Sequence, residues 1–161
     1  MKIIFLDVDG VLNCQSSESK CHGFIGIDSD KVKRLRKIIE ATDAKIVLTS
    51  TWKKDWIKDL DRKDEQNVYG NYLENKLKQE DLFILDKTTE EKNMSCRGEG
   101  IFNYLRSHNV DQWIAIDDDI FDDYEDYGIM EHLVKTDFYK YYGGIQDEHV
   151  KLAIEMLNKT E

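Results

Sequence analysis

Three short clusters of polar residues in this chain could do chemistry, and each comes directly after an apolar run. They are Asp7-Val8-Asp9-Gly10, Thr49-Ser50-Thr51 and Asp117-Asp118-Asp119. Carboxylates that crowd together raise one another's pKa, so such a group is costly unless a cation lies among them. Oxygen ligands suit a hard ion, and Mg²⁺ is the usual one where a substrate phosphate completes the coordination shell. If the clusters meet, their residue types predict a Mg²⁺ site that handles phosphate.

The apolar runs before the clusters predict the strands that would bring them together. KIIFL at 2–6, KIVL at 45–48 and WIAI at 113–116 are nearly continuous apolar runs. This pattern is typical of strands that are buried on both faces, as in a parallel sheet covered by helices. LFIL at 82–85 and HLV at 132–134 are weaker candidates for two further strands.

Apolar residues at helical spacing alternate with these strands. The three sets are Val32, Leu35 and Ile39; Ile101, Leu105 and His108; and Val150, Ile154 and Leu157. Asp28 or Ser29 is placed to cap the first of these helices. The alternation predicts an α/β fold with a doubly wound, Rossmann-like parallel sheet and helices on both faces. Ligands bind at the carboxyl ends of the strands in such sheets, where the three polar clusters would lie.

Length and composition favour a single domain over residues 1–161. The chain is 40% hydrophobic, and its 23 Lys and Arg against 33 Asp and Glu give a formal net charge of −10. That charge offers no broad basic surface for nucleic acid, so phosphate chemistry must depend on local positive groups. No apolar run approaches the length of a membrane span and no secretory signal is visible, so we expect a cytoplasmic protein without a membrane partner.

The segment 53–91 departs from the strand and helix alternation. It is highly charged, carries Tyr69, Tyr72 and Leu77 at helical spacing, and is too long for a simple crossover. We interpret it as a possible small insertion over or beside the site. Because the stretch 13–28 is also short, we expect no large cap domain.

Three other features have plain structural explanations. Cys14, Cys21 and His22 invite a zinc assignment, but structural zinc takes four ligands, so free thiols are favoured. The tyrosines of 137–144 could stack on bases, and packing against an edge strand is the favoured interpretation. The remaining acidic residues after the third strand are interpreted as a solvated loop: Asp119, Asp122, Asp123, Glu125 and Asp126.

A single Asp-x-Asp-Gly is more often a turn than a catalytic site, because Asp and Gly both favour tight turns. Three strand-end clusters in this order are a stronger signal. DVDGV resembles the first motif of the haloacid dehalogenase (HAD) superfamily, VLTSTW the second and WIAIDDD the fourth, with Arg97 as the third. The longer pattern, with RGEGI and a closing GGI, is similar to the HAD domain branch of the Swiss Army Knife RNA repair proteins.

This resemblance implies a Mg²⁺-dependent phosphatase. Asp7 would be the nucleophile that forms an aspartyl-phosphate. Asp9 would be the general acid and then the base, and a carboxylate at this position argues for ester hydrolysis. Mg²⁺ would be held by Asp7, the backbone carbonyl of Asp9 and Asp118, with Asp117 behind them or as an alternative ligand.

The resemblance also implies groups that bind the phosphoryl oxygens. Ser50 or Thr49 would donate a hydrogen bond, with Ser50 favoured, while the other hydroxyl would cap the following helix. Arg97 would offset the charge of the phosphoryl group, with Lys92 and Lys87 as competitors for this role.

A protein of another class also collects acidic residues at strand ends, namely a non-catalytic, receiver-like module that senses phosphate. A receiver places its acidic pair after the first strand and its phosphoacceptor Asp after a middle strand, whereas here the middle strand ends in Thr-Ser-Thr. The motif order therefore favours the phosphatase. Its substrate could be a nucleic-acid 3′-phosphate end, which the net charge does not support, or a small phosphorylated metabolite.

Overall fold

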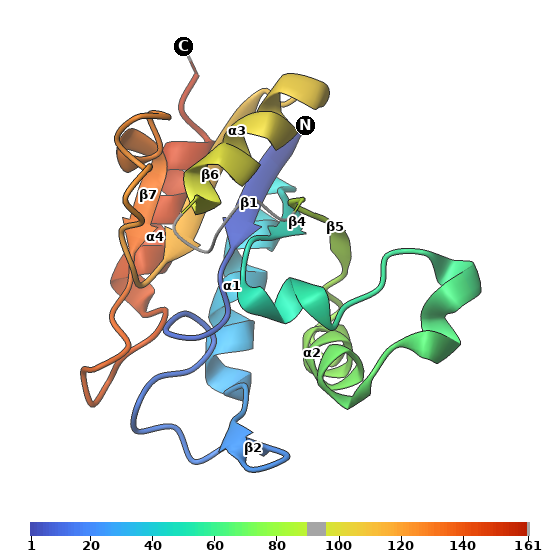
Figure 1. Ribbon diagram of the computed structural model, residues 1–161. Helices are drawn as coiled ribbons and strands as arrows, with labels where there is room; N and C mark the ends of the chain where they lie inside the picture. Colours follow the sequence, from blue (N-terminus) through green and yellow to red (C-terminus); the bar gives the residue numbers. More distant parts are fainter. Residues whose placement is uncertain (90–95, 161) are drawn as a thin grey trace.

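A computed structural model describes residues 1–89 and 96–160. Its centre is a five-stranded sheet with the order β5-β4-β1-β6-β7, in which all neighbours run parallel (Figure 1). The strands are β1 (Lys2–Leu6), β4 (Lys45–Leu48), β5 (Ile84–Lys87), β6 (Gln112–Asp117) and β7 (Leu133–Lys135). All five predicted strands are confirmed, although β5 begins two residues later than the apolar run 82–85.

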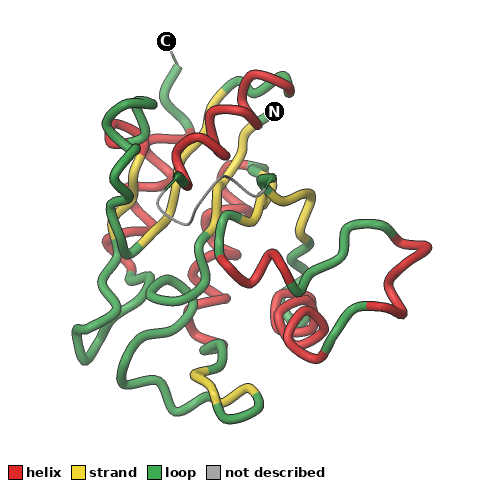
Figure 2. Tube along the Cα trace, viewed as in Figure 1, coloured by secondary structure: helices red, strands yellow, loops and turns green. Residues whose placement is uncertain are grey.

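Helices cover both faces of the sheet (Figure 2). They are α1 (Ser29–Thr42), α2 (Val68–Lys78), α3 (Arg97–Ser107) and α4 (Asp147–Leu157). On one face Ile4 and Leu6 of β1 pack in a core shared with α1, α2 and α4. On the other face Ile3 and Phe5 pack with α3. Successive residues of a strand point to opposite faces, so burial of both faces requires the continuous apolar run. The predicted doubly wound α/β fold is confirmed.

The connection from β1 to α1 carries a small antiparallel hairpin, β2 (Lys20–Cys21) and β3 (Phe24–Ile25). Its turn uses His22 and Gly23, both at positive φ. Asp28 precedes α1 at the N-cap position, as expected, but its side chain makes no cap hydrogen bond. The Asp28 carboxylate instead accepts hydrogen bonds from Ser17 and Lys31. It therefore ties the hairpin connection to the first turn of α1.

The segment 53–91 lies partly in the core and partly outside it. Leu73 and Leu77 of α2 are buried against the sheet, and β5 forms one sheet edge. The 3₁₀ helix η2 (Leu60–Glu65) has no buried residue and stands out from the rest of the molecule (Figure 1). Two further 3₁₀ helices are η1 (Thr51–Lys54), which follows β4, and η3 (Met130–His132). Among the described residues, the sheet carries no large cap domain.

The loop 137–144 contradicts the expectation that its tyrosines pack against an edge strand. Tyr139, Tyr141 and Tyr142 are 78%, 74% and 80% exposed. The reason is the turn that Asp137 makes: its carboxylate accepts from the Tyr139 amide and its carbonyl accepts from the Gly144 amide. The loop closes on itself, and these three rings are left in solvent.

No helix within the described ranges, 1–89 and 96–160, has the length and apolar character that crossing a membrane requires.

Candidate active site

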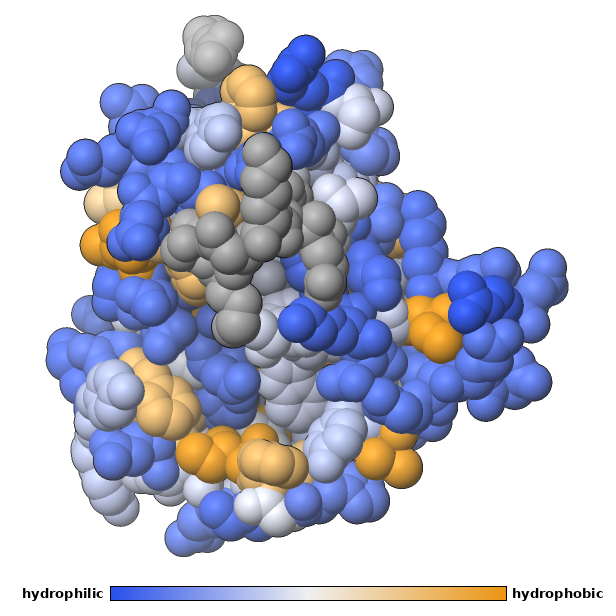
Figure 3. All heavy atoms as spheres, viewed as in Figure 1, coloured by the Kyte–Doolittle hydropathy of each residue, from blue (hydrophilic) through white to orange (hydrophobic). Residues whose placement is uncertain are grey.

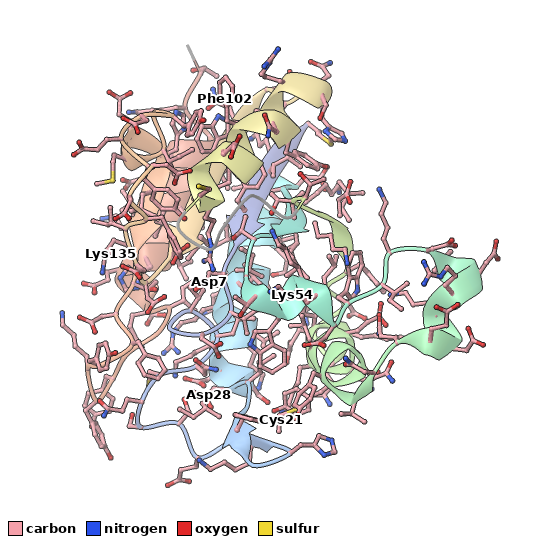
Figure 4. The ribbon with its side chains drawn as sticks, in the orientation of Figure 1. Asp7, Cys21, Asp28, Lys54, Phe102 and Lys135 are labelled. Atoms are coloured by element: carbon pink, nitrogen blue, oxygen red, sulfur yellow. The ribbon has the colours of Figure 1, made fainter. Side chains whose placement is uncertain are left out.

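The ends of the three central strands meet at one edge of the sheet. Leu6 pairs with Leu48 on one side and with Ile116 on the other, so the residues that follow are level with one another. The Asp7 amide donates to the Ile116 carbonyl (3.0 Å), and the Thr49 amide donates to the Leu6 carbonyl (3.0 Å). Figure 4 shows Asp7 at the end of β1. The register thus brings the three polar clusters together, as the sequence predicted.

Asp7, Asp117 and Asp118 form an acidic cluster. Each offers one carboxylate oxygen, and these three atoms lie within 4.8 Å of one another. Burial raises the pKa of Asp7 well above its ordinary value, the charges of Asp117 and Asp118 raise it further, and Arg97 opposes them. Burial and the charge of Asp117 also raise the pKa of Asp118. A hard divalent cation fits this donor set, because it would offset the repulsion that raises these pKa values.

Arg97 supplies positive charge to the cluster. Its Nη1 lies 3.0 Å from Asp7 Oδ1 and 2.8 Å from Asp117 Oδ2. The guanidinium also lies over the ring of Phe121, 4.1 Å from the centroid. Burial opposes the charge, but the neighbouring carboxylates outweigh it, so the pKa of Arg97 is raised above its usual value. We call Asp7, Asp117, Asp118 and Arg97 the carboxylate pocket.

Arg97 is the first residue of α3, and the acidic loop after β6 holds that end of the helix. The two carboxylate oxygens of Asp123 accept from the amides of Gly98 (2.9 Å) and Glu99 (2.8 Å). A Cβ at Gly98 would lie 2.7 Å from Asp123 Oδ1, so only glycine allows this approach. Free helix amides and the helix dipole both favour a carboxylate here. The expected solvated loop is confirmed for Asp119, Asp122, Glu125 and Asp126, which are exposed, whereas Asp123 is half-buried and holds the helix.

Asp117 is almost fully buried and uses both carboxylate oxygens to organise its neighbours. Oδ2 accepts from the Tyr124 hydroxyl (2.8 Å) as well as from Arg97, and Oδ1 accepts from the Asp119 amide (3.0 Å). Burial and the charge of Asp117 raise the pKa of Tyr124, which keeps the phenol protonated as a donor. These bonds make Asp117 the anchor that holds Arg97 in the pocket.

Gly10 lets the first cluster pass close to the third. Its φ is +83°, and a Cβ there would lie 2.2 Å from Asp118 Cγ. A side chain at this position would therefore be strained in its backbone and would displace a pocket carboxylate. The Thr136 hydroxyl donates to the Gly10 carbonyl (2.6 Å) and fastens the turn to the chain after β7.

Asp9 is exposed at the mouth of the pocket, and its carboxylate is held by two donors. Asn13 Nδ2 donates to Oδ1 (2.9 Å), and Trp52 Nε1 donates to Oδ2 (3.1 Å). Asn13 is itself fixed, because its Oδ1 accepts from the Gly10 amide (2.9 Å). The carboxylate of Asp9 lies outside the acidic cluster; the expected metal contact of this residue involves its backbone carbonyl.

The hydroxyls after β4 lie beside the pocket. Ser50 is 1% exposed, and its Oγ accepts from the Trp52 amide (3.2 Å), which caps η1. Thr49 is 3% exposed, whereas Thr51 is exposed and contributes to the wall of the cavity above the carboxylates. The choice between Ser50 and Thr49 as a phosphate ligand stays a prediction, and Thr51 joins the candidates.

Lys87, one of the two competitors of Arg97, lies away from the carboxylates. Lys87 Nζ donates to the carbonyls of Lys53 (2.8 Å) and Trp56 (2.6 Å), on the β5 side of η1. Lys92 lies outside the described residues. Within the part of the chain that the structure describes, Arg97 is the cation that contacts the pocket carboxylates through the ion pairs above.

The carboxylates open into a cavity of about 240 Å³. Its wall combines charged groups with two aromatic rings: Asp7, Asp9, Thr51, Arg97, Asp117, Asp118, Asp119, Phe121 and Phe138. The molecular face in Figure 3 is largely hydrophilic, with hydrophobic atoms in small separate patches. Cys21 lies on the hairpin, away from Asp7 (Figure 4), and Cys14 and Cys21 are free thiols, as expected.

Sequence reasoning missed four residues that position this site, namely Asn13, Trp52, Asp123 and Tyr124. Trp52 is the last residue of VLTSTW, and Asn13 and Tyr124 follow the first and third clusters within a few positions, but no periodic pattern marks these three as site residues. Asp123 had the clearer signal, since an Asp shortly after the third cluster can reach the first turn of the helix that carries Arg97.

A buried carboxylate cluster with an arginine, at the carboxyl ends of parallel strands, is the arrangement of an α/β protein that handles phosphoryl groups. The family whose model matches this chain is described as the HAD domain in Swiss Army Knife RNA repair proteins, and the match covers residues 3–150. The chain therefore belongs to that family, as its motifs indicated, and the family points to phosphatase-type activity. No curated protein and no solved structure matches the chain significantly.

Proposed function

We propose that this protein is a Mg²⁺-dependent phosphomonoester hydrolase that acts through an aspartyl-phosphate. The observation that carries the proposal is the carboxylate pocket: Asp7 contacts Arg97 at 3.0 Å and shares an oxygen cluster with Asp117 and Asp118. The proposed nucleophile, the arginine beside it and the carboxylates that would hold a cation lie close together at the floor of the cavity.

Asp7 is the proposed nucleophile. Its carboxylate oxygen attacks phosphorus, the bond to the ester oxygen breaks, and the phosphoryl group is left on Asp7. Water then attacks the same phosphorus and displaces the Asp7 carboxylate, which returns the enzyme to its starting state. Arg97, held by Asp117, donates hydrogen bonds to the phosphoryl oxygens during both steps.

Asp9 is the proposed proton donor and acceptor. It protonates the leaving ester oxygen in the first step and takes a proton from the attacking water in the second, so its protonation state is restored after each turnover. Asn13 and Trp52 orient its carboxylate toward the cavity by one hydrogen bond each.

The oxygens of Asp7 and Asp118, with the backbone carbonyl of Asp9, would hold Mg²⁺, and Asp117 stands behind them. Bound there, Mg²⁺ would supply Lewis-acid stabilisation of charge on the phosphoryl group. The raised pKa values of Asp7 and Asp118 support this assignment, since a cation would offset the repulsion between the carboxylates and stabilise their buried negative charge.

The test uses an aryl phosphate as a generic substrate. Phosphate release should require a divalent cation: chelation should abolish it, Mg²⁺ should restore it, and Ca²⁺ should not, because calcium takes more ligands at longer distances. Full activity in excess chelator would contradict the metal assignment. Stable labelling of the protein by a small phosphodonor, without turnover, would instead support the receiver-like module.

Two classes of substrate fit the proposed chemistry, a nucleic-acid 3′-phosphate end and a small phosphorylated metabolite. The name of the family favours the first, whereas the net charge of −10 disfavours tight binding of a polyanion. A parallel screen of phosphorylated metabolites, phosphopeptides and 3′-phosphate oligonucleotides would separate them.

A further inference from the structure

A second cavity opens beside the carboxylate pocket. Its volume is about 660 Å³, which is in the range of small-molecule sites. It lies next to the smaller cavity, because Asp9, Thr51 and Phe138 line both. We call it the aromatic groove, after its lining residues: Asp9, Phe24, Ile25, Thr51, Trp52, Asp55, Tyr69 and Phe138. A molecule whose phosphate lies over Asp7 can therefore extend into the groove past Asp9.

Aromatic rings dominate the lining of this groove. Tyr69 meets Trp52 edge to face at 6.4 Å between centroids, and it meets Phe24 in the same way at 6.1 Å. Trp52 also packs against Tyr72 at 6.3 Å between centroids, so the most accessible ring of the groove is that of Phe24, which is 66% exposed, while Trp52 and Tyr69 are half-buried. Exposed aromatic faces along a concave surface are suited to stacking against a planar ring.

The charges in the groove restrict what else it accepts. Asp9 and Asp55 are its charged residues, both acidic, and the described residues that line it include no Lys or Arg. An additional phosphate in the groove would meet negative charge without a cation to offset it. A nucleic-acid strand, whose affinity depends on basic contacts to successive phosphates, is disfavoured for the same reason.

We propose that the aromatic groove binds the leaving group of the substrate, and that this group is a neutral, planar heteroaromatic one, so the preferred substrate class is a nucleoside monophosphate. This inference rests on the proposed phosphatase activity. The single phosphate occupies the carboxylate pocket, and the base stacks on the rings of Phe24, Trp52 or Tyr69. The neutral nucleoside leaves after its ester oxygen takes the proton from Asp9.

The first experiment compares kcat/KM for adenosine 3′- and 5′-monophosphates, ribose 5-phosphate and a short 3′-phosphate oligonucleotide, with Mg²⁺ present. We expect a mononucleotide to exceed ribose 5-phosphate by about 10-fold or more, the size of one stacking contact. Equal values for mononucleotide and ribose phosphate would overturn the inference while leaving the phosphatase intact. A preference for the oligonucleotide would overturn the choice of a mononucleotide.

Two variants test whether the preference for a mononucleotide arises in the aromatic groove. Phe24→Leu keeps an apolar side chain but removes the ring face, so it should lower kcat/KM for the mononucleotide several-fold more than kcat/KM for ribose 5-phosphate. Phe83→Leu is the matched control, because Phe83 is 69% exposed, close to the 66% of Phe24, and is absent from the groove lining. Equal effects of the two substitutions on the mononucleotide would contradict the inference.

A binding measurement separates this inference from the proposed function. Asp7→Asn removes the proposed nucleophile but none of the groove rings. Calorimetry on this variant should show adenosine monophosphate binding more tightly than ribose 5-phosphate, even if the parent protein hydrolyses neither. If the parent protein also releases no phosphate from an aryl phosphate with Mg²⁺, the proposed function is wrong while the groove assignment stands. Equal affinities of the variant for adenosine monophosphate and ribose 5-phosphate would refute the assignment of the groove as a base-binding site.

Discussion

The carboxylate pocket and the aromatic groove share a boundary at Asp9 but are built in opposite ways. The pocket is buried and held by a network of hydrogen bonds. Asp117 is 1% exposed and accepts hydrogen bonds from Arg97, Tyr124 and the Asp119 amide. The groove is open, and Phe24 stands on a two-residue strand of a hairpin. Chemistry on a phosphoryl group needs charges that do not reorganise, whereas recognition of a leaving group tolerates a looser surface.

Trp52 belongs to both regions. Its ring lines the groove, and its Nε1 donates to Asp9 Oδ2 at 3.1 Å. A leaving group that stacks in the groove is therefore placed next to the residue that protonates it. Substitutions in the pocket should affect all substrates alike, and substitutions in the groove should affect only those with a planar group.

Asp7→Asn should have the largest effect, because it removes the nucleophile. Removal of a covalent nucleophile in other hydrolases costs about 10⁶-fold in kcat, so phosphate release should fall to background for every substrate. The fold should persist, since the substitution removes one buried negative charge and Arg97 keeps Asp117. Phosphate release and thermal unfolding measure the two effects. Parent-level turnover of an aryl phosphate would refute the covalent mechanism.

The loss of activity in Asp9→Asn should be the next largest, and its size should depend on the leaving group. General acid-base assistance is typically worth about 10²–10⁴-fold, so poor leaving groups should lose that much. A nitrophenyl phosphate needs no proton on its leaving oxygen and should still transfer phosphate to Asp7. Hydrolysis of the aspartyl-phosphate would be slow, so rapid quench with labelled substrate should trap phosphoenzyme.

Equal losses for good and poor leaving groups, with no trapped phosphoenzyme, would show that Asp9 only supports the metal or the turn. Asn13→Ala is a useful companion variant, because it removes one of the two donors that orient Asp9 and leaves the carboxylate in place. Its loss should be smaller than that of Asp9→Asn for the same substrate.

Trp52→Phe sharpens the comparison at the shared boundary. It keeps an aromatic face in the groove but removes the donor to Asp9, so kcat should fall by about 10-fold, the value of one hydrogen bond to a charged group. The ratio of kcat/KM for a mononucleotide and ribose 5-phosphate should change little. A changed ratio with unchanged kcat would mean that Trp52 acts in recognition alone.

The smallest effect concerns the hairpin that carries Phe24. Burial raises the pKa of Asp28, but hydrogen bonds from Lys31 and Ser17 outweigh it, so the net pKa is lowered. A lowered folded-state pKa means that the Asp28 contribution to stability is complete above the unfolded pKa, about 3.9, and is lost as pH falls through the lower folded value. Asp28→Asn should therefore destabilise the protein modestly at neutral pH.

The pH dependence of unfolding provides the check. The free energy difference between parent and Asp28→Asn should shrink as the pH is lowered below about 4, because the parent carboxylate is then protonated too. A difference that stays constant from neutral to acidic pH would mean that the charge of Asp28 plays no part.

The sequence by itself determined the fold class and the location of the chemistry. A strand buried on both faces needs an uninterrupted apolar run, and KIIFL, KIVL and WIAI meet that demand locally. Polar residues directly after such runs share one edge of a parallel sheet, and the position of β1 between β4 and β6 in the structure brings Asp7 and Asp118 together there. The sequence also predicts Gly10 as a turn residue, because Asp and Gly favour tight turns.

Only the tertiary structure decided which side chains support that edge. Asp123 reaches α3, Tyr124 reaches Asp117 and Trp52 reaches Asp9 across segments that are distant in sequence or lack a regular period. The aromatic groove draws its rings from four segments: the hairpin, η1, α2 and the loop after β7. The pattern of buried residues in a strand or helix repeats along the chain, so the sequence alone predicts it. Contacts between irregular segments depend on how the helices and strands pack, and the spacing of residues in the sequence does not predict them.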